Sequence, residues 1–430
     1  MTTAPSRTAE IRAVAQHDRV KAEQMLEGFI GALFDIPVEG LAINLDQYSL
    51  NSLNGFFTSA GQDFFFKFHQ EEGEEQMRGE YYRADILARA GLPVDQPVHI
   101  STLPGEQVLV YARRSDPRFS DVLLELDQTN DARSIARAAS AEAALNAHIL
   151  SCAKDSLHPI TPAQSSGEPI HRLFHERLVD QPDRRYPGGR LARFYSGKRF
   201  RFPGDVWLDW EQICNARPVI NGIEHTHPLG AMFDLAHQRY APERLADAGG
   251  IIAHGDAHNA NVWYQRGTEA DALAFFDPAF AGNNVPSLVA EVKSTFHNIF
   301  AHPFWLYNPG IAEKRFKARV RLEGDILRID TDWAPSAVRQ RLLQTKASSF
   351  WKPWLAHLVT QEMLPDDWET VIRIGLFLSP TLVMNLNAGE GAERHNPVSS
   401  AIGLAVALSA GSPPVAGRDL FTDFFDSIRP

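Results

Sequence analysis

The polar residues between positions 254 and 277 have the types and the spacing that phosphoryl transfer requires. The segment His254-Gly-Asp-Ala-His-Asn-Ala-Asn261 contains Asp256 and, five residues later, Asn261; Asp277 follows at the end of an apolar run. In phosphoryl transfer, one aspartate orients or deprotonates the attacking hydroxyl, while an asparagine and a second aspartate hold magnesium against the nucleotide phosphates. Magnesium prefers a few hard oxygen ligands from the protein, so a carboxamide and a carboxylate suit it.

A strand, a tight loop and a hairpin are expected to position these residues. The apolar run 251–253 leads into Gly255, which is typical of a strand that ends in a tight loop. Residues 262–264 and 272–276 have the composition of two short strands separated by a turn. The second strand delivers Asp277, so a hairpin can bring it back to the loop.

With these residues the chain resembles the aminoglycoside phosphotransferase and choline kinase superfamily, whose fold is similar to that of protein kinases. HGDAHNANVW is similar to the catalytic loop of that family, and FFDPAFAG is similar to its metal-binding segment. The resemblance implies that Asp256 is the catalytic aspartate and that Asn261 and Asp277 are metal ligands. His258 occupies a position where the family often carries histidine. The resemblance covers roughly residues 40–300, with its sharp motifs in three short segments.

The residues of the loop leave two other interpretations open. Asp256 and Asn261 are both common turn formers. His254 and His258 can be histidines that only hydrogen-bond the backbone, and we favour this role for His254. The H-x-D-x-H pattern also resembles the ligand cluster of a metallohydrolase. That interpretation is weakened because Ile252 stands where a further histidine would be expected.

The region before residue 70 predicts an antiparallel sheet that contains one unusual lysine. Residues 41–45, 56–57 and 64–68 are strand-like and separated by turn formers, which favours a meander. Lys67 lies among phenylalanines in the third strand, and burying an unpaired charge is costly. In the kinase-like interpretation, Lys67 contacts the α- and β-phosphates and pairs with a helix glutamate. The alternative is an edge-strand lysine that points to solvent.

The helical run 74–90, which ends before Gly91, supplies a glutamate for that pairing. Glu80 shares one helix face with an alanine and a leucine and is therefore expected to point inward. GEYYRADILARAGLPV also resembles the corresponding helix and turn of the family. We predict that Glu80 pairs with Lys67, with Glu75 as the second candidate.

Three further residues are candidates for nucleotide binding. Asn54 and Gly55 lie in the turn-rich segment 51–55, where the family's phosphate-covering loop is expected, although neither a G-x-G-x-x-G nor a P-loop pattern is present. Tyr111 ends the strand-like segment 107–111, which in the family leads into the hinge whose backbone binds adenine; core packing is an equal alternative for this side chain. The cofactors expected are Mg²⁺ and ATP, with GTP left open.

The composition excludes several classes of protein. The chain has 430 residues, of which 44% are apolar and 22% charged, as in ordinary soluble proteins. The formal net charge of −11 argues against broad nucleic-acid binding. Two cysteines make neither a disulfide framework nor a zinc cluster. The first ten residues contain no signal core, and the apolar stretch 401–408 is too short to span a bilayer. We expect a cytoplasmic protein with no membrane or nucleic-acid partner; its oligomeric state stays open.

Two segments fall outside the resemblance. Seven basic residues crowd the segment 184–201, which could be an anion-binding lid for a phosphorylated or carboxylated acceptor. We favour the alternative of a solvated loop with local ion pairs. These residues are Arg184, Arg185, Arg190, Arg193, Lys198, Arg199 and Arg201. Residues 316–333 alternate in polarity and predict a β-hairpin, an unusual insertion in a helical lobe.

Taken together, these patterns predict an α+β, bilobal, protein-kinase-like fold with a small antiparallel β lobe and a mainly helical large lobe. The expected divisions are an N-terminal helical extension (1–39), a small nucleotide-binding lobe (40–112) and a large catalytic and acceptor-binding lobe (113–430). The expected activity is transfer of the γ-phosphoryl group of a nucleoside triphosphate to a hydroxyl of an amino sugar, antibiotic, sugar or amino alcohol. The alternatives are a non-catalytic nucleotide-binding regulator on the same fold and a metal-dependent hydrolase.

Overall fold

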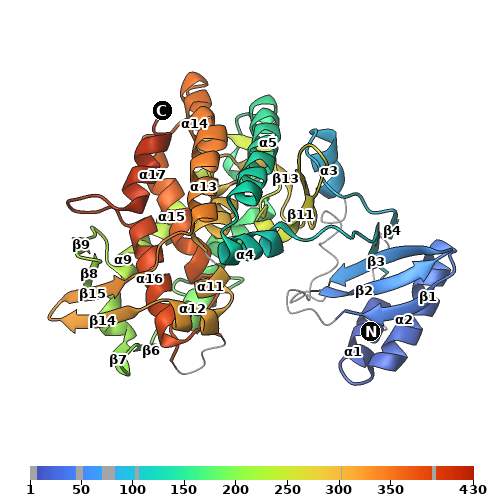
Figure 1. The fold of residues 1–430 in the computed structure, drawn as a ribbon, viewed down its shortest axis with the longest axis horizontal. Helices are drawn as coiled ribbons and strands as arrows, with labels where there is room; N and C mark the ends of the chain where they lie inside the picture. Colours follow the sequence, from blue (N-terminus) through green and yellow to red (C-terminus); the bar gives the residue numbers. More distant parts are fainter. Residues whose placement is uncertain (1–6, 45–51, 70–82, 102–105, 302, 390–393) are drawn as a thin grey trace. The chain divides into compact units, whose positions relative to one another are not determined.

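The fold is α+β and divides into two compact units (Figure 1). A computed structural model describes residues 7–44, 52–69, 83–101, 106–301, 303–389 and 394–430. The first unit comprises residues 1–88 and 94–116, and the second comprises residues 89–93 and 117–430. An antiparallel sheet dominates the first unit, whereas the second is mainly helical. This is the fold class that the sequence predicts.

The sheet of the first unit has five antiparallel strands in the order β1-β2-β3-β5-β4. The strands are β1 (Glu39–Ile43), β2 (Ser52–Ser59), β3 (Gln62–His69), β4 (His99–Ser101) and β5 (Val108–Ala112). The helices of this part of the chain are α1 (Arg7–Ala15), α2 (Arg19–Phe34) and α3 (Arg83–Arg89). The first three strands form the predicted meander. Strand β3 lies inside the sheet, so Lys67 is not on an edge strand.

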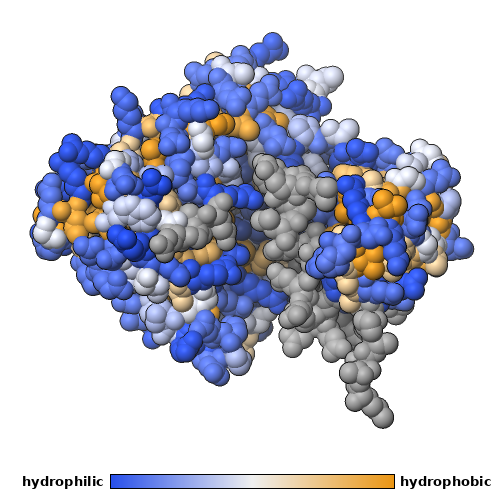
Figure 2. Space-filling view, turned by 90° about the horizontal axis from the view of Figure 1, so that it is seen from below, coloured by the Kyte–Doolittle hydropathy of each residue, from blue (hydrophilic) through white to orange (hydrophobic). Residues whose placement is uncertain are grey.

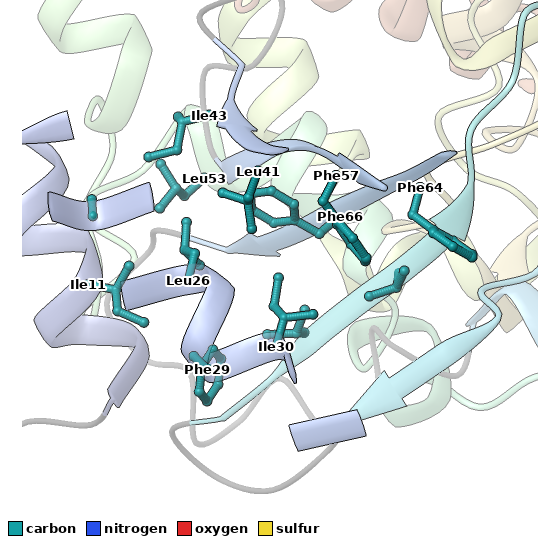
Figure 3. Packing of buried hydrophobic residues seen from close by; sticks show 13 residues of the cluster. Ile11, Leu26, Phe29, Ile30, Leu41, Ile43, Leu53, Phe57, Phe64 and Phe66 are labelled. Atoms are coloured by element: carbon teal, nitrogen blue, oxygen red, sulfur yellow. The ribbon is translucent and has the colours of Figure 1, made fainter. Parts of the chain in front are cut away.

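One apolar cluster joins the two N-terminal helices to this sheet. Leu26 and Ile30 of α2 pack in the same cluster as Phe57 of β2 and Phe66 of β3 (Figure 3). Fully burying an apolar side chain of this size contributes roughly 1.5–3 kcal/mol. The helices therefore share a core with the sheet, and the first compact unit extends to residue 116.

Asn54 and Gly55 lie inside a strand, which corrects the expectation of a turn at these positions. They belong to β2, where Asn54 is opposite Lys67 and Gly55 is opposite Phe66. A Cβ at Gly55 would lie 2.2 Å from the backbone oxygen of Ala42 and 2.7 Å from the Phe66 ring. The glycine therefore allows a close approach within the sheet. The turn formers at 45–51 lie outside the described residues.

The longer helices of the second unit carry its core. They are α4 (Phe119–Thr129), α5 (Ala132–Ser156), α9 (Leu229–Arg239), α13 (Ala337–Lys346), α14 (Lys352–Thr360), α15 (Trp368–Thr381), α16 (Pro397–Gly411) and α17 (Leu420–Ile428). Short helices are α6 (Pro162–Ser166), α7 (Gly189–Phe194), α8 (Trp210–Cys214), α10 (Val292–Thr295), α11 (Pro303–Leu306) and α12 (Pro309–Arg315). The apolar stretch 401–408 is buried within α16. Within the described parts of the chain, no helix combines the length and apolar composition needed to cross a membrane.

Short 3₁₀ and π-helical turns complete the second unit. The 3₁₀ turns are η2 (Pro169–Leu173), η3 (His175–Arg177), η4 (Pro242–Ala248) and η5 (Asn259–Asn261). Two π-helical turns, η6 (Phe296–Phe300) and η7 (Ala347–Trp351), directly follow α10 and α13. Such wide turns are rare and are frequently found at functional sites.

The predicted hairpin at 316–333 is confirmed and belongs to a small mixed sheet. Its strands are β14 (Ala318–Glu323) and β15 (Ile326–Thr331). Strand β15 pairs in parallel with β8 (Arg217–Ile220), which pairs with β9 (Ile223–Glu224) (Figure 1). The insertion therefore completes a sheet with a segment about a hundred residues earlier. The remaining pairs are β6 (Arg199–Phe202) with β7 (Val206–Asp209), β10 (Gly250–Ala253) with β13 (Gly282–Pro286), and β11 (Val262–Gln265) with β12 (Ala272–Phe275).

The surface follows the composition of the chain. Hydrophilic residues predominate on the face shown in Figure 2, with apolar residues in scattered groups. Both cysteines are free and buried, and burial raises the pKa of the Cys152 thiol to about 11. A thiol with so high a pKa is a poor nucleophile, so Cys152 is best regarded as a packing residue.

Candidate active site

The loop that carries Asp256 is shaped by a glycine and by the backbone of Asp256 itself. After β10 the chain turns at Gly255, which has a φ of +74°, and a Cβ there would lie 2.5 Å from the backbone oxygen of Phe280. The backbone oxygen of Asp256 accepts hydrogen bonds from the backbone N–H of His258 (2.9 Å) and from Nδ2 of Asn261 (3.0 Å). The loop therefore holds the aspartate and the asparagine in one compact turn, as the sequence predicts.

His254 connects this loop to the strand that leads to Asp277. Its Nε2 lies 3.0 Å from the backbone oxygen of Phe276, and its Nδ1 accepts a hydrogen bond from the backbone N–H of Asp256 at 3.3 Å. Burial lowers the pKa of His254, which favours the neutral ring that this pattern needs. Both ring nitrogens are engaged, so His254 has the backbone-bonding role that we favoured.

The metallohydrolase interpretation lacks the metal ligands that it requires. Because both nitrogens of His254 bond to the chain, this residue is not available as a metal ligand. Within the described residues, no group of three or more histidine, cysteine, aspartate or glutamate side chains could hold a metal ion. Hydrolytic metal centres usually need three such ligands.

The predicted hairpin brings Asp277 back to the end of the loop. Strands β11 and β12 are antiparallel, with Val262 opposite Phe275. One step further, the backbone N–H of Phe276 donates to the backbone oxygen of Asn261 at 3.0 Å. Asp277 follows directly with a φ of +54°, a left-handed conformation that aspartate tolerates better than most residues. Asn261 and Asp277 therefore lie at the same end of the hairpin.

The donor atoms of these two residues suit a magnesium ion. The amide NH₂ of Asn261 is fixed on the backbone oxygen of Asp256, so the amide oxygen faces away from that bond. Asp277 adds a half-buried carboxylate. Magnesium is commonly bound through one or two protein oxygens, with water and phosphate oxygens completing the octahedron. Asn261 and Asp277 could therefore hold Mg²⁺.

Lys293 is the principal site residue that the sequence did not reveal. Its Nζ lies 2.5 Å from Oδ1 of Asp256, and the two side chains are 9% and 10% exposed. The distance is that of an ion pair between an ammonium and a carboxylate. Burial lowers the pKa of Lys293, and the charge of Asp256 opposes that effect. The signal in the sequence was a lysine directly after the mainly apolar stretch 288–292, a weaker form of the signal that identified Lys67.

One histidine lies beside the carboxylate of Asp256, and a second histidine lies next to the first. Nε2 of His258 is 3.7 Å from Oδ1 of Asp256, and burial lowers the pKa of His258 to about 4, so its ring is neutral at pH 7. The ring of His297 is 5.6 Å from that of His258, centroid to centroid. His297 Nδ1 lies 2.6 Å from the hydroxyl of Tyr307, while its buried Nε2 has no hydrogen-bond partner among the described residues.

A buried ion pair holds the loop in place through hydrogen bonds to η6. The backbone N–H of Asn259 donates to Oδ1 of Asn298 in η6 at 2.7 Å. The backbone oxygen of Asn298 accepts from Arg339, which is paired with Asp127 at 2.7 Å; both charged side chains are fully buried. The loop is therefore anchored through η6 to helices α13 and α4.

The candidate residues of the first unit lie on neighbouring strands. Lys67 of β3 is half-buried and is opposite Asn54 on one side and Leu109 on the other. Tyr111 of β5 is opposite Phe65. Glu80 and Glu75 lie outside the described residues. The pairing of Lys67 with Glu80 therefore stays a prediction.

Most basic residues of the segment 184–201 are exposed arginines that form ion pairs with acidic side chains. The ion pairs are Arg184–Glu243 (2.8 Å), Arg185–Asp180 (2.6 Å), Arg199–Asp209 (3.1 Å) and Arg201–Asp205 (3.1 Å). Arg193 and Lys198 are also exposed. Exposed pairs of this kind contribute little to stability. For these residues the solvated-loop interpretation holds.

Arg190 is the exception in this segment. It is half-buried, and its Nη1 donates to the backbone oxygens of Leu382 (2.8 Å) and Val383 (3.2 Å) at the end of α15. Arg177 donates to the same oxygen of Leu382 at 3.3 Å. Repulsion from Arg177 and Arg190 contributes to the lowered pKa of Lys293. The two guanidinium groups therefore converge on the end of α15.

Solved structures with a similar arrangement of the chain are small-molecule phosphotransferases. No protein-family model and no curated protein matches the sequence. The aminoglycoside phosphotransferase APH(4)-Ia is 11% identical and covers 91% of this chain and 99% of its own, with a TM-score of 0.43. An ethanolamine kinase of Plasmodium vivax is 8% identical over 95% of both chains (TM-score 0.41). A microcompartment-associated aminopropanol kinase is 13% identical over 92% of this chain and 99% of its own (TM-score 0.41). At these low scores the likenesses carry no argument about chemistry.

Proposed function

We propose that the protein transfers the γ-phosphoryl group of a nucleoside triphosphate to a hydroxyl group of a small molecule. The observation that carries this proposal is the convergence of Asp256, Asn261 and Asp277. Two hydrogen bonds produce it, from Asn261 to the backbone oxygen of Asp256 and from Phe276 to that of Asn261. An aspartate, an asparagine and a second aspartate in this arrangement are the set that phosphoryl transfer uses.

In this proposal Asp256 orients the acceptor hydroxyl and takes its proton as the bond to phosphorus forms. Proton transfer to a positioned side chain contributes typically 10²- to 10⁴-fold, about 3–5 kcal/mol. Lys293, at 2.5 Å, is a positioning residue that fixes the direction of the carboxylate. His258 is neutral at pH 7, so it does not add a second cation beside Asp256.

Asn261 and Asp277 would hold Mg²⁺, which when bound neutralises charge on the β- and γ-phosphates. The protein's own contribution is the spacing of the two ligands. The bond from His254 to the backbone oxygen of Phe276 ties the loop to the end of β12, immediately before Asp277. The left-handed backbone of Asp277 is a local strain of the kind that surrounding structure maintains at functional positions.

The first unit would bind the nucleotide, with ATP as the proposed substrate. Lys67 would contact the α- and β-phosphates, oriented by Glu80. Asn54 and Gly55, opposite and beside Lys67 on β2, are the further candidates for contact with the phosphates. The backbone near Tyr111 would bind the base.

A nucleotide-consumption screen over small hydroxyl compounds tests the proposal, with mass spectrometry to detect a product that has gained one phosphate. Asp256→Ala should bind nucleotide as the wild type does but lose turnover. Asp426→Ala, which removes an exposed aspartate paired with Arg418, is the control and should retain activity. Wild-type turnover in Asp256→Ala would exclude the assigned role. Tight nucleotide binding without consumption over the whole panel would favour the non-catalytic regulator.

A further inference from the structure

Lys293 of α10 places a charged ammonium group directly against Asp256. Its Nζ lies 2.5 Å from Oδ1 of that carboxylate, and the Lys293 side chain is 9% exposed. His258 is the other basic neighbour of Asp256 among the described residues, at 3.7 Å. Burial lowers the pKa of His258 to about 4, so its ring is neutral at pH 7. Of these two neighbours, Lys293 is therefore the one that supplies a positive charge.

The ammonium group of Lys293 has donors left for a bound molecule. A lysine ammonium carries three N–H donors, and Oδ1 of Asp256 engages one of them. Lys346, by comparison, bonds to two side-chain oxygens at 2.7 and 2.9 Å and lies 4.8 Å from the centre of the Phe350 ring. Lys293 is therefore able to bind a further oxygen atom.

The proposed reaction brings phosphoryl oxygens within reach of this ammonium group. A hydroxyl that gives its proton to Asp256 lies roughly 2.6–3.2 Å from the carboxylate. The phosphorus that this hydroxyl attacks lies roughly 3–3.5 Å further on in a reactive arrangement. Because the lysine side chain is flexible and carries its compact charge at the end, a small movement of Nζ is enough to meet a phosphoryl oxygen.

The charges around Asp256 change during transfer in a direction that releases Lys293. Before transfer, the carboxylate and the ammonium group neutralise one another. When the hydroxyl proton passes to Asp256, the carboxylate loses its charge and with it most of its attraction for the lysine. Negative charge is spread at the same time over the oxygens of the phosphoryl group. Since two unit charges 4 Å apart interact by about 4 kcal/mol at an effective dielectric constant near 20, Lys293 is then attracted to these oxygens.

We propose that Lys293 is a catalytic residue that contacts the phosphoryl group during its transfer, besides positioning Asp256. This inference rests on the proposed kinase function and assigns to Lys293 the stabilisation of charge in the transition state. The acceptor oxygen forms a bond to the γ-phosphorus as the bond from that phosphorus to the bridging oxygen breaks. The hydroxyl proton passes to Asp256, the nucleoside diphosphate leaves with the electron pair, and Lys293 keeps its own proton throughout.

A lysine that only positions the carboxylate and a lysine that also contacts phosphate respond differently to the loss of Asp256. The first has no function left in Asp256→Asn, whereas the second still binds the phosphoryl group there. A double-mutant cycle on Lys293 and Asp256 therefore separates the two roles. The affinity for a mimic of the transferred phosphoryl group is a suitable readout, because it requires no knowledge of the acceptor.

Calorimetry of ADP binding to the intact protein, with and without aluminium fluoride as the phosphoryl mimic, provides this test. Saturating Mg²⁺ is present throughout, and the four proteins are the wild type, Lys293→Met, Asp256→Asn and the double variant. We expect aluminium fluoride to tighten ADP binding in the wild type. Lys293→Met should reduce this tightening by about 10- to 100-fold, the range of a lost charge-assisted hydrogen bond, and leave the affinity for ADP alone unchanged. The same reduction should appear when Lys293→Met is added to Asp256→Asn.

Three controls accompany the cycle. Lys293→Arg, which keeps the charge, should retain part of the tightening. Lys352→Met removes an exposed lysine of α14 and should behave as the wild type does. Thermal unfolding checks that each variant is folded. A reduction that Lys293→Met causes only while Asp256 is present would overturn the proposal and leave Lys293 as a positioning residue.

The same measurements distinguish failure of this inference from failure of the kinase function. If aluminium fluoride tightens ADP binding equally in the wild type and in Lys293→Met, the contact with phosphate is excluded while the kinase function stands. If aluminium fluoride has no effect on the wild type and no hydroxyl compound of the screen leads to nucleotide consumption, the kinase function fails and the role of Lys293 fails with it.

Discussion

Two buried lysines of the second unit each meet a carboxylate, but the two pairs are built differently. Nζ of Lys346 lies 2.7 Å from Oε2 of Glu291 and 2.9 Å from Oδ1 of Asn146, and the side chains of the ion pair are each 3% exposed. Nζ of Lys293 lies 2.5 Å from Oδ1 of Asp256, and these side chains are about three times more exposed. Each lysine closely precedes a π-helical turn.

Under the proposed function, the difference separates a structural ion pair from one that takes part in the reaction. In the Lys346 pair the donors and acceptors satisfy one another, and Ser294 adds a further hydrogen bond to Glu291 at 2.7 Å. In the Lys293 pair the carboxylate keeps acceptor capacity for another molecule. The number of bonds that a buried charge makes within the protein is therefore a better guide to its role than its burial.

The largest expected effect is on turnover in Asp256→Ala. We expect kcat to fall by about 10³-fold, because removing the group that takes the hydroxyl proton removes most of its typical 10²- to 10⁴-fold contribution. The thermal midpoint should fall less than in a Lys346 variant, because the pair of Asp256 and Lys293 is more exposed than that of Glu291 and Lys346. Steady-state kinetics and thermal unfolding measure the two effects. A loss of stability as large as that of a Lys346 variant would remove the distinction between the pairs.

The converse change is Lys346→Met. It leaves Glu291 buried without its cation, so the free energy of unfolding should fall by about 3–5 kcal/mol. Lys293→Met is the matched variant and should cost at most about 1 kcal/mol, because its partner is more exposed, while kcat falls by about 10- to 100-fold. Urea denaturation and kinetics on both variants provide the comparison. Equal losses of stability would show that both lysines are structural.

Asp277→Ala should change the response to magnesium. The wild type is expected to bind nucleotide at least about tenfold more tightly with Mg²⁺ than without it, because the metal links carboxylate to phosphate. The variant should lose that tightening, whereas Asp271→Asn, at the opposite end of the same hairpin, should keep it. Calorimetry with and without magnesium decides. Identical affinities in both conditions for the wild type would exclude the metal site.

The smallest expected effect concerns Glu142, which is buried beside the Lys346 pair. Burial raises the pKa of Glu142, the charge of Lys346 opposes this, and that of Glu291 adds to it. As pH rises above the ordinary value of 4.5, the unfolded chain loses this proton before the folded protein does, so folding loses stability until the folded pKa is passed. Glu142→Gln should therefore raise the thermal midpoint at pH 8 and change it little at pH 4. An equal shift at both values would show that the ionisation of Glu142 plays no part.

The parts of the site that could be predicted are those set by local spacing. Asp256, Asn261 and Asp277 lie within one loop and the hairpin that follows, so turn formers and apolar runs sufficed to bring them together. The fold class followed from strand and helix patterns in the same way. The roles of these residues stay predictions.

The convergence of Arg177 and Arg190 on the backbone oxygen of Leu382 could not be predicted, because the oxygen lies about two hundred residues further along the chain. No periodicity links Arg177, Arg190 and Lys293, and among seven crowded basic residues only the burial of Arg190 distinguishes it from its exposed neighbours. Gly55 was misplaced for a related reason: glycine is typical of turns, whereas here it allows the contact with Ala42 across the sheet. Predicting either feature would require knowledge of which segments pack together.

The π-helical turn η6 makes the site sensitive to a change of a single codon. The backbone N–H of Ala301 bonds to the oxygen of Phe296 at 2.9 Å, so the turn contains one residue more than an α-helical turn. Deleting one residue here would restore an ordinary helix but rotate everything beyond the deletion by about 100°. Asn298 would then leave the catalytic loop, while Lys293 would stay. One insertion or deletion in this turn would therefore be enough to form or remove the contact between Asn298 and the loop.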